Sequence, residues 1–475
     1  MLCIIWGASM NKLVLGTFSS IFLLLGVIII YYWRDIQYEP SSLDLVSYFL
    51  IWPVVLSIIL LAPYFIYQAY QSYIRCRQQH HALLEQQSNK AHTEHELKVE
   101  EIQCFNLNIF SSSVCHAWGE NTTIIDGLKK FKSPELDPHL ENSYGLAVLS
   151  YRIQMLDHIL KLEENEQNEE DKVGRLARIK ALIQQQLEQQ NETLMQVAEH
   201  LKRSALFYDS ELAYQYRMHP GWSNTDTSSR DADEQCISIK PVPRLNRLNI
   251  HILLSDNVLH VWDEYSSREM LSNFMQSLGT ISQQIHLQHH YIAQQSAYTD
   301  WLNLLDQISK QSQEFSLIMN VDSEIDQTFL DEKMSGVDDY LPAEFASSWC
   351  VAAEGVKINN LDAIKTLKVA NNVGNLLTCL NQEMPDHADQ TQQEQPFILV
   401  LDDTTDIKNV KKNNQTFLST LIEPYHFIHT YPIFGHTQQL AKIFGFMLGM
   451  HLSKEMTSMI YSTDQALTHA FFKSM

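Results

Sequence analysis

The chain has 475 residues and is strongly acidic, with 56 Asp and Glu against 34 Lys and Arg and a formal net charge of −22. Nucleic-acid binders need basic patches that replace phosphate counterions, and the basic runs at 129–132 and 408–412 are short, so nucleic acid is excluded as an expected partner. The low numbers of Gly (15) and Pro (13) exclude a repetitive fibre and a disordered tail.

Two apolar stretches near the N-terminus, residues 13–33 and 45–70, contain no charged residue. Each is long enough to cross a hydrocarbon core of about 30 Å, which takes about 20 helical residues. The sequence therefore predicts a two-helix transmembrane hairpin over residues 1–70. A polar helical tether follows at 71–102, and about 400 residues after the hairpin are expected to be water-soluble.

The charges beside these stretches predict the orientation of the hairpin. Lys12 precedes the first stretch, Arg75 and Arg77 follow the second, and the connector at 34–44 is mainly acidic. Because basic residues mark the cytoplasmic side, we expect both ends of the hairpin and the soluble part to face the cytoplasm. Met1 and Met10 are both candidate translation starts, and either one leaves both stretches in place.

A cleaved signal peptide is the alternative interpretation of the first stretch. No small-residue cleavage site follows it, and Tyr31, Tyr32 and Trp33 close it in the manner of an interfacial aromatic belt.

The cysteines number seven, are widely spread and form no CxxC pair. This usage fits a reducing cytoplasm and predicts no disulfide framework.

The soluble part alternates strand-like and helix-like segments. A strand is predicted at 103–115 and a helix at 121–131, and a polar loop at 221–235 is read as the boundary between a first half at 103–220 and a second half at 221–475. Apolar runs of strand length follow at 248–254, 316–321, 349–352, 397–401 and 427–433. Helical stretches near 265–310, 360–380, 408–422 and 438–453 separate most of them. This alternation predicts a layered α/β fold.

The strongest helical periodicity lies at residues 174–206. Apolar residues recur there every three or four positions, as one face of an amphipathic helix requires: Leu176, Ile179, Ile183, Leu187, Leu194, Val197 and Leu201. One interpretation is a helix that packs on the core of the domain. The other is a helix that binds a partner or forms a coiled coil, and it makes these seven residues a candidate partner-binding face.

Two short motifs could carry chemistry. Gly435, His436 and Thr437 lie between a strand-like and a helix-like segment, where Thr437 could cap the helix and an anion could bind beside the histidine. Asp402 and Asp403 end an apolar strand, but adjacent carboxylates on a strand point to opposite faces. We therefore interpret the two aspartates as turn and capping residues, and the histidine has a structural reading as well.

Histidine clusters raise the question of a metal site. His286, His289 and His290 fall near one helical face, as do those at 80, 81, 92 and 95, but no zinc-binding signature accompanies either group. We interpret them as solvated helix faces and predict no metal and no cofactor. Phosphate-binding GxxxxGK[ST], GxGxxG, GxSxG and HExxH motifs do not occur, so an ATPase or a serine hydrolase has little support.

Four segments resemble thiolase-like ketoacyl synthases. FNLNIFSSSVCHAWGENTTIIDGLKKF resembles their opening strand, turn and helix, and LPAEFASSWCVAAEGV resembles a later glycine-containing strand. PFILVLDDTTDIKNVKKNN resembles the strand that carries their first catalytic histidine, and FGHTQQLAKIFGFMLGMHL resembles their Gly-His-Thr helix. The resemblance spans about residues 103–455 and implies a thiolase-like fold of two related halves, with 435–437 as a remnant of the family motif.

Three departures from the family pattern predict that the chain is not an enzyme. Carboxylates and threonine stand at 402–404, where the resemblance expects the first histidine, and the family's lysine would fall near Tyr431. The nucleophilic cysteine should lie on a buried central helix, yet no cysteine occurs between Cys236 and Cys350. Acyl transfer needs a cysteine thiolate and its histidines, so the resemblance implies a catalytically inactive scaffold.

The combination of a membrane hairpin and an inactive thiolase-like scaffold resembles the inner-membrane-associated adaptors of bacterial type VI secretion. This resemblance implies a non-enzymatic adaptor or chaperone that binds a lipase-like effector and delivers it to the secretion spike. It also implies location at the bacterial inner membrane. Two alternatives remain open: an immunity protein that neutralises a toxin, and an acyl-transfer or acyl-binding enzyme that uses His436 with Cys350 or Cys115.

Overall fold

The computed structural model describes residues 29, 31–32, 34–35, 102–164, 174–218, 241–334, 340–403, 406–431, 440–453 and 455–474. The chain forms two compact units, Met1–Val99 and Glu100–Met475. The predicted hairpin and tether lie outside the described residues, apart from the few near residue 30 and Ile102. Within the described residues, no helix has the length and apolar character needed to cross a membrane.

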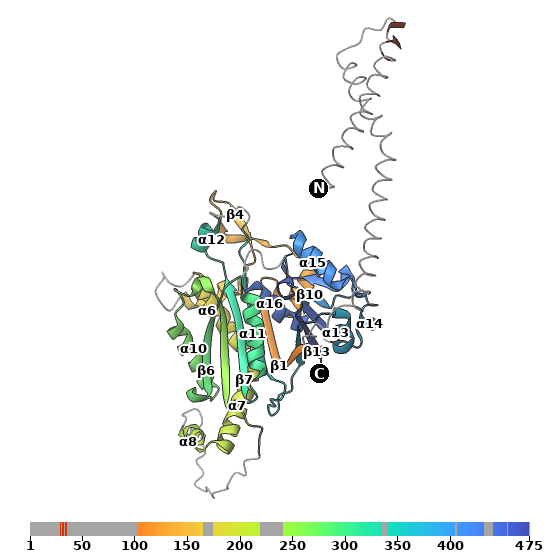
Figure 1. Ribbon diagram of the computed structural model, residues 1–475. Coiled ribbons are helices and arrows are strands. Elements are labelled where there is room, and N and C mark those ends of the chain that lie inside the picture. Colours follow the sequence, from red (N-terminus) through yellow and green to blue (C-terminus); the bar gives the residue numbers. More distant parts are fainter. Residues whose placement is uncertain are drawn as a thin grey trace. The chain divides into compact units, whose positions relative to one another are not determined.

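One mixed β-sheet organises the second unit (Figure 1). Apolar residues that alternate with polar ones, or run continuously where both faces are covered, form its strands. The strands follow one another across the sheet in the order β11 (Phe427–His429), β10 (Ile398–Val400), β12 (Ser458–Tyr461), β13 (His469–Ser474), β9 (Lys365–Asn371), β1 (Gln103–His116), β8 (Glu344–Ala353), β7 (Glu314–Ser323), β5 (Arg247–Ser255) and β6 (Ile285–Ile292). A two-residue strand, β2 (Gly119–Glu120), pairs with the end of β1.

The sheet consists of two halves with the same topology. When the strands of each half are numbered along the chain, β6-β5-β7-β8-β1 and β11-β10-β12-β13-β9 both read 3-2-4-5-1. Strands 2, 3 and 4 are mutually parallel in each half, and strand 5 runs antiparallel to its neighbours on both sides. The chain is therefore built from two related halves, which confirms that part of the predicted α/β fold.

The two halves meet where β1 pairs with β9. The first part of β1 runs antiparallel to β9, and a later part pairs with β8 across a bulge between Ile109 and Ser111. The half that begins with β1 therefore also contains β5 to β8, and β9 begins the other half. The predicted boundary at residue 221 is wrong, because residues on both sides of it belong to one half; the division lies between Ala353 and Lys365.

Helices cover the sheet so that helix and sheet alternate in five layers. The outer face of the first half packs on α5 (Gln154–Glu164), α6 (Arg175–Gln189), α7 (Asn191–Tyr208) and α10 (Glu264–Ser277). The outer face of the second half packs on α13 (Leu376–Glu383) and α15 (Ile407–Phe417). Between the halves lie α4 (Thr122–Lys129), α11 (Ala297–Ser309) and α16 (Ala441–Leu448).

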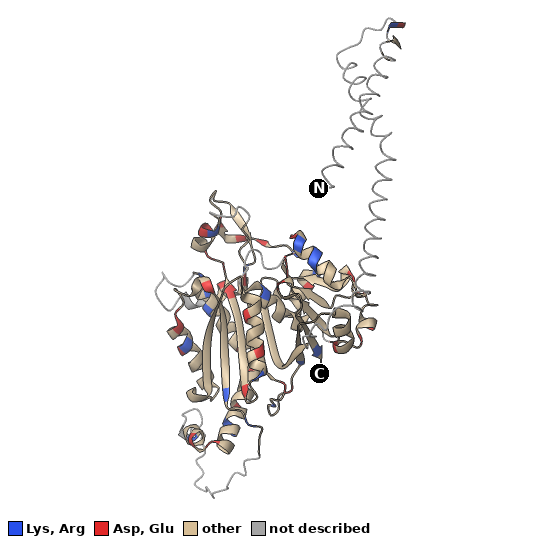
Figure 2. Cartoon of the chain, viewed as in Figure 1, with Lys and Arg blue, Asp and Glu red and all other residues tan. Residues whose placement is uncertain are grey.

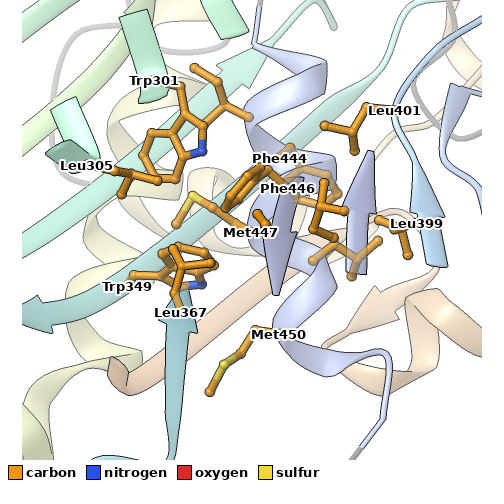
Figure 3. Packing of buried hydrophobic residues seen from close by; sticks show 14 of the residues in the cluster. Trp301, Leu305, Trp349, Leu367, Leu399, Leu401, Phe444, Phe446, Met447 and Met450 are labelled. Carbon is orange, nitrogen blue, oxygen red and sulfur yellow. The ribbon is translucent and has the colours of Figure 1, made fainter. Parts of the chain in front are cut away.

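The central layer holds a tightly packed aromatic core (Figure 3). Trp301 of α11 lies 5.7 Å from Trp349 of β8 and 5.7 Å from Phe446 of α16, measured between ring centroids. Strand residues alternate between this core and the outer ones: Leu399 faces the central core, while its neighbour Ile398 faces the outer core of the second half. Period-two alternation of this kind is what a strand covered on both faces produces.

The predicted helix at 174–206 is two helices, and its apolar face lies inside the domain. α6 ends at Gln189 and α7 begins at Asn191. Gln190, between them, is buried, and its amide nitrogen donates a 2.9 Å hydrogen bond to Ser348 of the sheet. Six of the seven candidate partner-binding residues are fully buried in the core beside β5 and β7, and Leu176 packs against it. These side chains stabilise the fold and are not available to a partner, which corrects the partner-binding interpretation.

Smaller elements complete the domain. They include the hairpin of β3 (Glu135–Glu141) and β4 (Ala147–Ser150), the helices α8 (Ser210–Met218), α12 (Gln327–Met334) and α14 (His387–Gln390), and the short 3-10 helix η4 (Pro424–His426). The sequence prediction missed β6, β9, β12 and β13. As a result, His286, His289 and His290, which we interpreted as residues of a helix face, lie on the edge strand β6. His80, His81, His92 and His95 lie outside the described residues.

Candidate functional site

A cleft of about 950 Å³ opens where β10 and β11 end. These strands are parallel, so their carboxyl ends lie at the same edge of the sheet, which is where open α/β sheets commonly bind ligands. Apolar and aromatic side chains make up much of its lining. The lining includes Trp118, Leu128, Lys129, Phe131, Lys132, Pro134, Tyr151, Leu341, Pro396, Val400, Asp402, Asp403, Asn409, Val410, Asn413, Asn414, Tyr425, Phe427, Ile428 and His429.

The end of α4 forms one wall of the cleft. The Phe131 N–H donates to the Leu128 carbonyl (3.1 Å) and the Lys132 N–H donates to the Gly127 carbonyl (3.0 Å). These two bonds are those of a Schellman motif, whose left-handed position is usually glycine. Phe131 occupies that position with a φ of 50°, at a cost of about 1–2 kcal/mol. Its ring is 86% exposed, so a strained backbone holds an aromatic side chain at the rim.

Helix α15 and the turn of η4 also line the cleft. Asp406 caps α15 by accepting a 2.9 Å hydrogen bond from the Lys408 N–H, and Phe417 anchors the other end in the outer core. Val410 and the asparagines at 409, 413 and 414 line the cleft. Ile407, at the start of α15, is 68% exposed but does not line the cleft.

Asp402, at the floor, is a structural residue. It follows β10, and its carboxylate accepts hydrogen bonds from the Ser462 hydroxyl (3.0 Å) and the Thr463 N–H (2.6 Å). The ammonium group of Lys442 lies 3.3 Å from the same carboxylate. These donors tie the end of β10 to the end of β12, in agreement with the turn and capping role that the sequence predicts for Asp402.

His429 is the titratable group at the floor that sequence reasoning missed. Burial lowers the pKa of His429, and the nearby Asp402 carboxylate partly opposes this shift. Its Nδ1 has no hydrogen-bond partner among the described residues. Beside it, burial and a hydrogen bond to the Asp403 carboxylate raise the pKa of Tyr431. The cleft thus presents a neutral imidazole at pH 7, while Tyr431 does not line it.

A second cleft, of about 380 Å³, extends the first toward the β3–β4 hairpin. The two share Trp118, Lys132 and Tyr151 among their lining residues, and the second continues past Leu136 and Asp137. Together they form an elongated depression with the segment after α4 in the middle.

Cys115 and Cys350 are poorly placed for nucleophilic chemistry. Burial raises the pKa of both Cys115 and Cys350 to about 12, and Cys350 donates a 3.5 Å hydrogen bond to the Gln190 side chain. A raised pKa removes the thiolate, which is the nucleophilic form. Neither residue lines the 950 Å³ cleft, although Cys115 contacts the smaller one. The central helix α11, at 297–309, contains no cysteine.

Comparison with known proteins finds similarity only in structure: no model of a protein family matches the sequence, and no curated protein does. A ketosynthase from module 6 of the bacillaene synthase of Bacillus subtilis is 10% identical over 78% of this chain and 72% of its own, with a TM-score of 0.37. OleA of Xanthomonas campestris is 10% identical over 79% of this chain and 98% of its own, with a TM-score of 0.33.

The peroxisomal 3-ketoacyl-CoA thiolase of Saccharomyces cerevisiae, a five-layered structure of two core domains with identical topology, is also similar. It is 8% identical over 48% of this chain and 83% of its own, with a TM-score of 0.29. Because all these TM-scores lie below 0.5, we base the description of the fold on the strand order of this chain and transfer no activity from these proteins.

The remaining predicted residues are distributed as follows. Gly435, His436 and Thr437 lie outside the described residues, within the connection from β11 to α16. No group of three or more His, Cys, Asp or Glu side chains suited to a metal ion occurs in the part of the chain that the structure describes. The cleft itself was not predicted, although the two lysine runs beside it were visible in the sequence.

Proposed function

We propose that this chain is a non-catalytic binding protein with a thiolase-like fold. Its role would be that of an adaptor or chaperone anchored in the bacterial inner membrane, which binds a lipase-like effector of type VI secretion and delivers it to the secretion spike. The observation that carries the non-catalytic part is the burial of Cys115 and Cys350, which raises the pKa of both thiols far above neutral pH.

The thiolase-like part of the proposal combines topology and sequence. The 3-2-4-5-1 order repeats in both halves, as a fold of two related halves requires. The segment that resembles the strand of the family's first histidine is β10 followed by Asp402, and the Gly-His-Thr segment directly precedes α16 of the central layer. Asp402 is engaged by Ser462, Thr463 and Lys442, and a carboxylate held in this way does not replace a catalytic histidine.

Binding is the function that the remaining geometry supports. The elongated depression exposes aromatic and aliphatic side chains next to lysines, and exposed apolar patches with polar rims are typical of protein interaction sites. A protein that escorts an effector needs such a surface and no reacting group. The two experiments that follow distinguish this role from the immunity and acyl-transfer alternatives.

The adaptor role is tested with the full-length protein, tagged at its C-terminus and purified from native membranes in detergent. We expect a lipase-like effector and a spike protein to copurify, identified by mass spectrometry. Copurification of a toxin without any spike component would favour the immunity alternative. A folded His436→Ala variant should retain the effector; loss of the effector from that variant would contradict a non-catalytic role for the motif.

The non-catalytic role is tested separately by incubating the same preparation with a reactive acyl-CoA analogue and measuring the intact mass. We expect no covalent adduct at Cys115 or Cys350. Labelling of either cysteine in the folded protein would overturn the proposal and favour the acyl-transfer alternative.

A further inference from the structure

Strand β6 forms one edge of the large sheet, and one of its two sides has no strand beside it. It pairs with β5 in parallel along all eight residues, from Leu248 opposite Ile285 to Ser255 opposite Ile292, and no bulge interrupts the register. No strand in the described part of the chain pairs with its other side (Figure 1). β6 therefore presents a continuous row of backbone N–H and C=O groups that a further strand could pair with.

β6 lacks the features that protect the edge strands of natural proteins from further pairing. Such protection takes the form of charged side chains, proline, a bulge or a very short strand. The sequence of β6, IHLQHHYI, contains no Asp, Glu, Lys, Arg or Pro, and the strand is tan from end to end in Figure 2. At the opposite edge of the sheet, β11 is only three residues long. One edge is thus protected by its shortness, and the other is open.

Exposed apolar side chains accompany the open edge. The 3-10 helix η2 (Asp256–Val258) and α10 both contact β6, and the Tyr291 hydroxyl donates a 2.7 Å hydrogen bond to Glu264 of α10. Three side chains of α10 and of the connection that leads to it from η2 are 46%, 59% and 77% exposed: Leu259, Val261 and Tyr265. They add apolar surface beside the strand, and a second molecule that pairs with β6 can bury it.

We propose that two copies of this chain pair β6 with β6, antiparallel about a two-fold axis, so that their sheets join into one. Pairing of this kind uses the same row of backbone groups on both copies and closes on itself. It opposes no like charges along the strand, although each chain carries a net charge of −22. Pairing of β6 with β11 of a second copy would instead build an open chain of molecules, and β11 offers only three residues for it.

The alternation of side chains along β6 restricts the register of this pairing. The Nε2 of His290 lies 3.1 Å from the Nδ1 of His251, on one face of the sheet, whereas Leu287 belongs to the outer core on the other face. Residues that oppose each other must lie on the same face, so only every second register is allowed. One allowed register places the two-fold axis at Gln288, so that this residue opposes its own counterpart. The next places the axis at His289 and opposes Gln288 with His290.

The oligomeric state of the full-length protein in detergent tests the proposal. Size-exclusion chromatography with light scattering should give twice the mass of one chain. Gln288→Lys should give the mass of one chain, because a lysine on both paired edges opposes pairing, and its urea midpoint should not change, because Gln288 is exposed. Gln382→Lys, at an exposed glutamine of α13, adds the same charge and should stay dimeric. A single-chain mass for the unsubstituted protein, or a dimeric Gln288→Lys variant, would overturn the proposal.

Disulfide trapping with copper phenanthroline tests the strand and its register. Gln288→Cys should form a 288–288 link between two copies in the first register. A mixture of Gln288→Cys and His290→Cys chains should form a 288–290 link in the second, and peptide mapping by mass spectrometry identifies either one. Gln382→Cys is the control and should not link to its counterpart. Absence of both links would overturn the proposal, and a link from position 288 to a different protein would assign the edge to a foreign strand instead of a second copy.

Discussion

Arg178 of α6 and Glu344 of β8 form a buried, two-bonded ion pair. The Arg178 guanidinium donates hydrogen bonds of 2.8 and 2.7 Å to the two carboxylate oxygens of Glu344. Both side chains are almost fully buried, and Asp157 lies 2.5 Å from the same guanidinium. The pair therefore fixes α6 to the beginning of β8, an interior strand of the sheet.

Arg178→Met should lower the free energy of unfolding by about 3–5 kcal/mol, because it leaves the Glu344 carboxylate buried without its partner. Arg203→Met removes an exposed pair with Glu199 and should cost less than about 1 kcal/mol. Urea denaturation followed by tryptophan fluorescence measures both. If both variants lost a similar free energy of unfolding, burial would not explain the contribution of the Arg178–Glu344 pair.

Gly449, just after α16, packs against the sheet without space for a side chain. A Cβ atom there would lie 2.3 Å from Ile460 and 2.9 Å from Phe472. Gly449→Ala should destabilise the protein by about 1–3 kcal/mol through overpacking. Gly355→Ala is the control, since nothing lies within 4 Å of its Cβ position. The melting temperature of Gly449→Ala should lie clearly below that of Gly355→Ala. An unchanged melting temperature for Gly449→Ala would show that the central layer rearranges to accommodate the methyl group.

Buried histidines predict acid sensitivity. Burial lowers the pKa of His469 to about 4, below the value near 6.5 of an unfolded chain. Between these two values the unfolded state binds the additional proton, so stability falls as the pH decreases below about 6.5, by up to about 1.4 kcal/mol per pH unit for this group. His469→Phe should flatten the dependence of the urea midpoint on pH between about 6.5 and 4. If the urea midpoint of His469→Phe depended on pH as strongly as that of the unsubstituted protein, His469 would not be a source of the acid sensitivity.

Thiol reactivity should follow burial. Cys104 is exposed, whereas Cys115 and Cys350 are buried with pKa values raised to about 12. In the native protein at pH 8, iodoacetamide should modify Cys104 well before the other two, and all three should react after unfolding in urea. Peptide mapping by mass spectrometry assigns each site. Early modification of Cys350 would indicate a thiolate in the folded protein.

The sequence predicts buried strands better than edge strands and distant pairings. β5, β7 and β8 are apolar runs, and the predicted segments at 248–254, 316–321 and 349–352 fall within them. β6 carries three histidines and was read as a helix, because one side of an edge strand is not covered and need not be apolar. The division into halves was misplaced because β1 pairs with strands far along the chain, and no local pattern encodes that pairing.

The cleft could not be predicted from local patterns for the same reason. Its walls come from residues near 118–134 and 396–429, which only the fold brings together. The partial signal was the presence of two lysine runs in an acidic chain. The periodicity at 174–206 correctly predicted an apolar face, but periodicity alone does not say whether core or partner covers it.

The position of β1 constrains how this domain can be made. β1 is the first strand of the domain to leave the ribosome, yet its partners β8 and β9 lie more than half of the domain later in the sequence. Until they emerge, an apolar strand and its unpaired backbone stay exposed, a state that favours aggregation and slow folding. We therefore expect nascent chains that end before Lys365 to depend on cellular chaperones, and folding to complete only after synthesis has passed the second half.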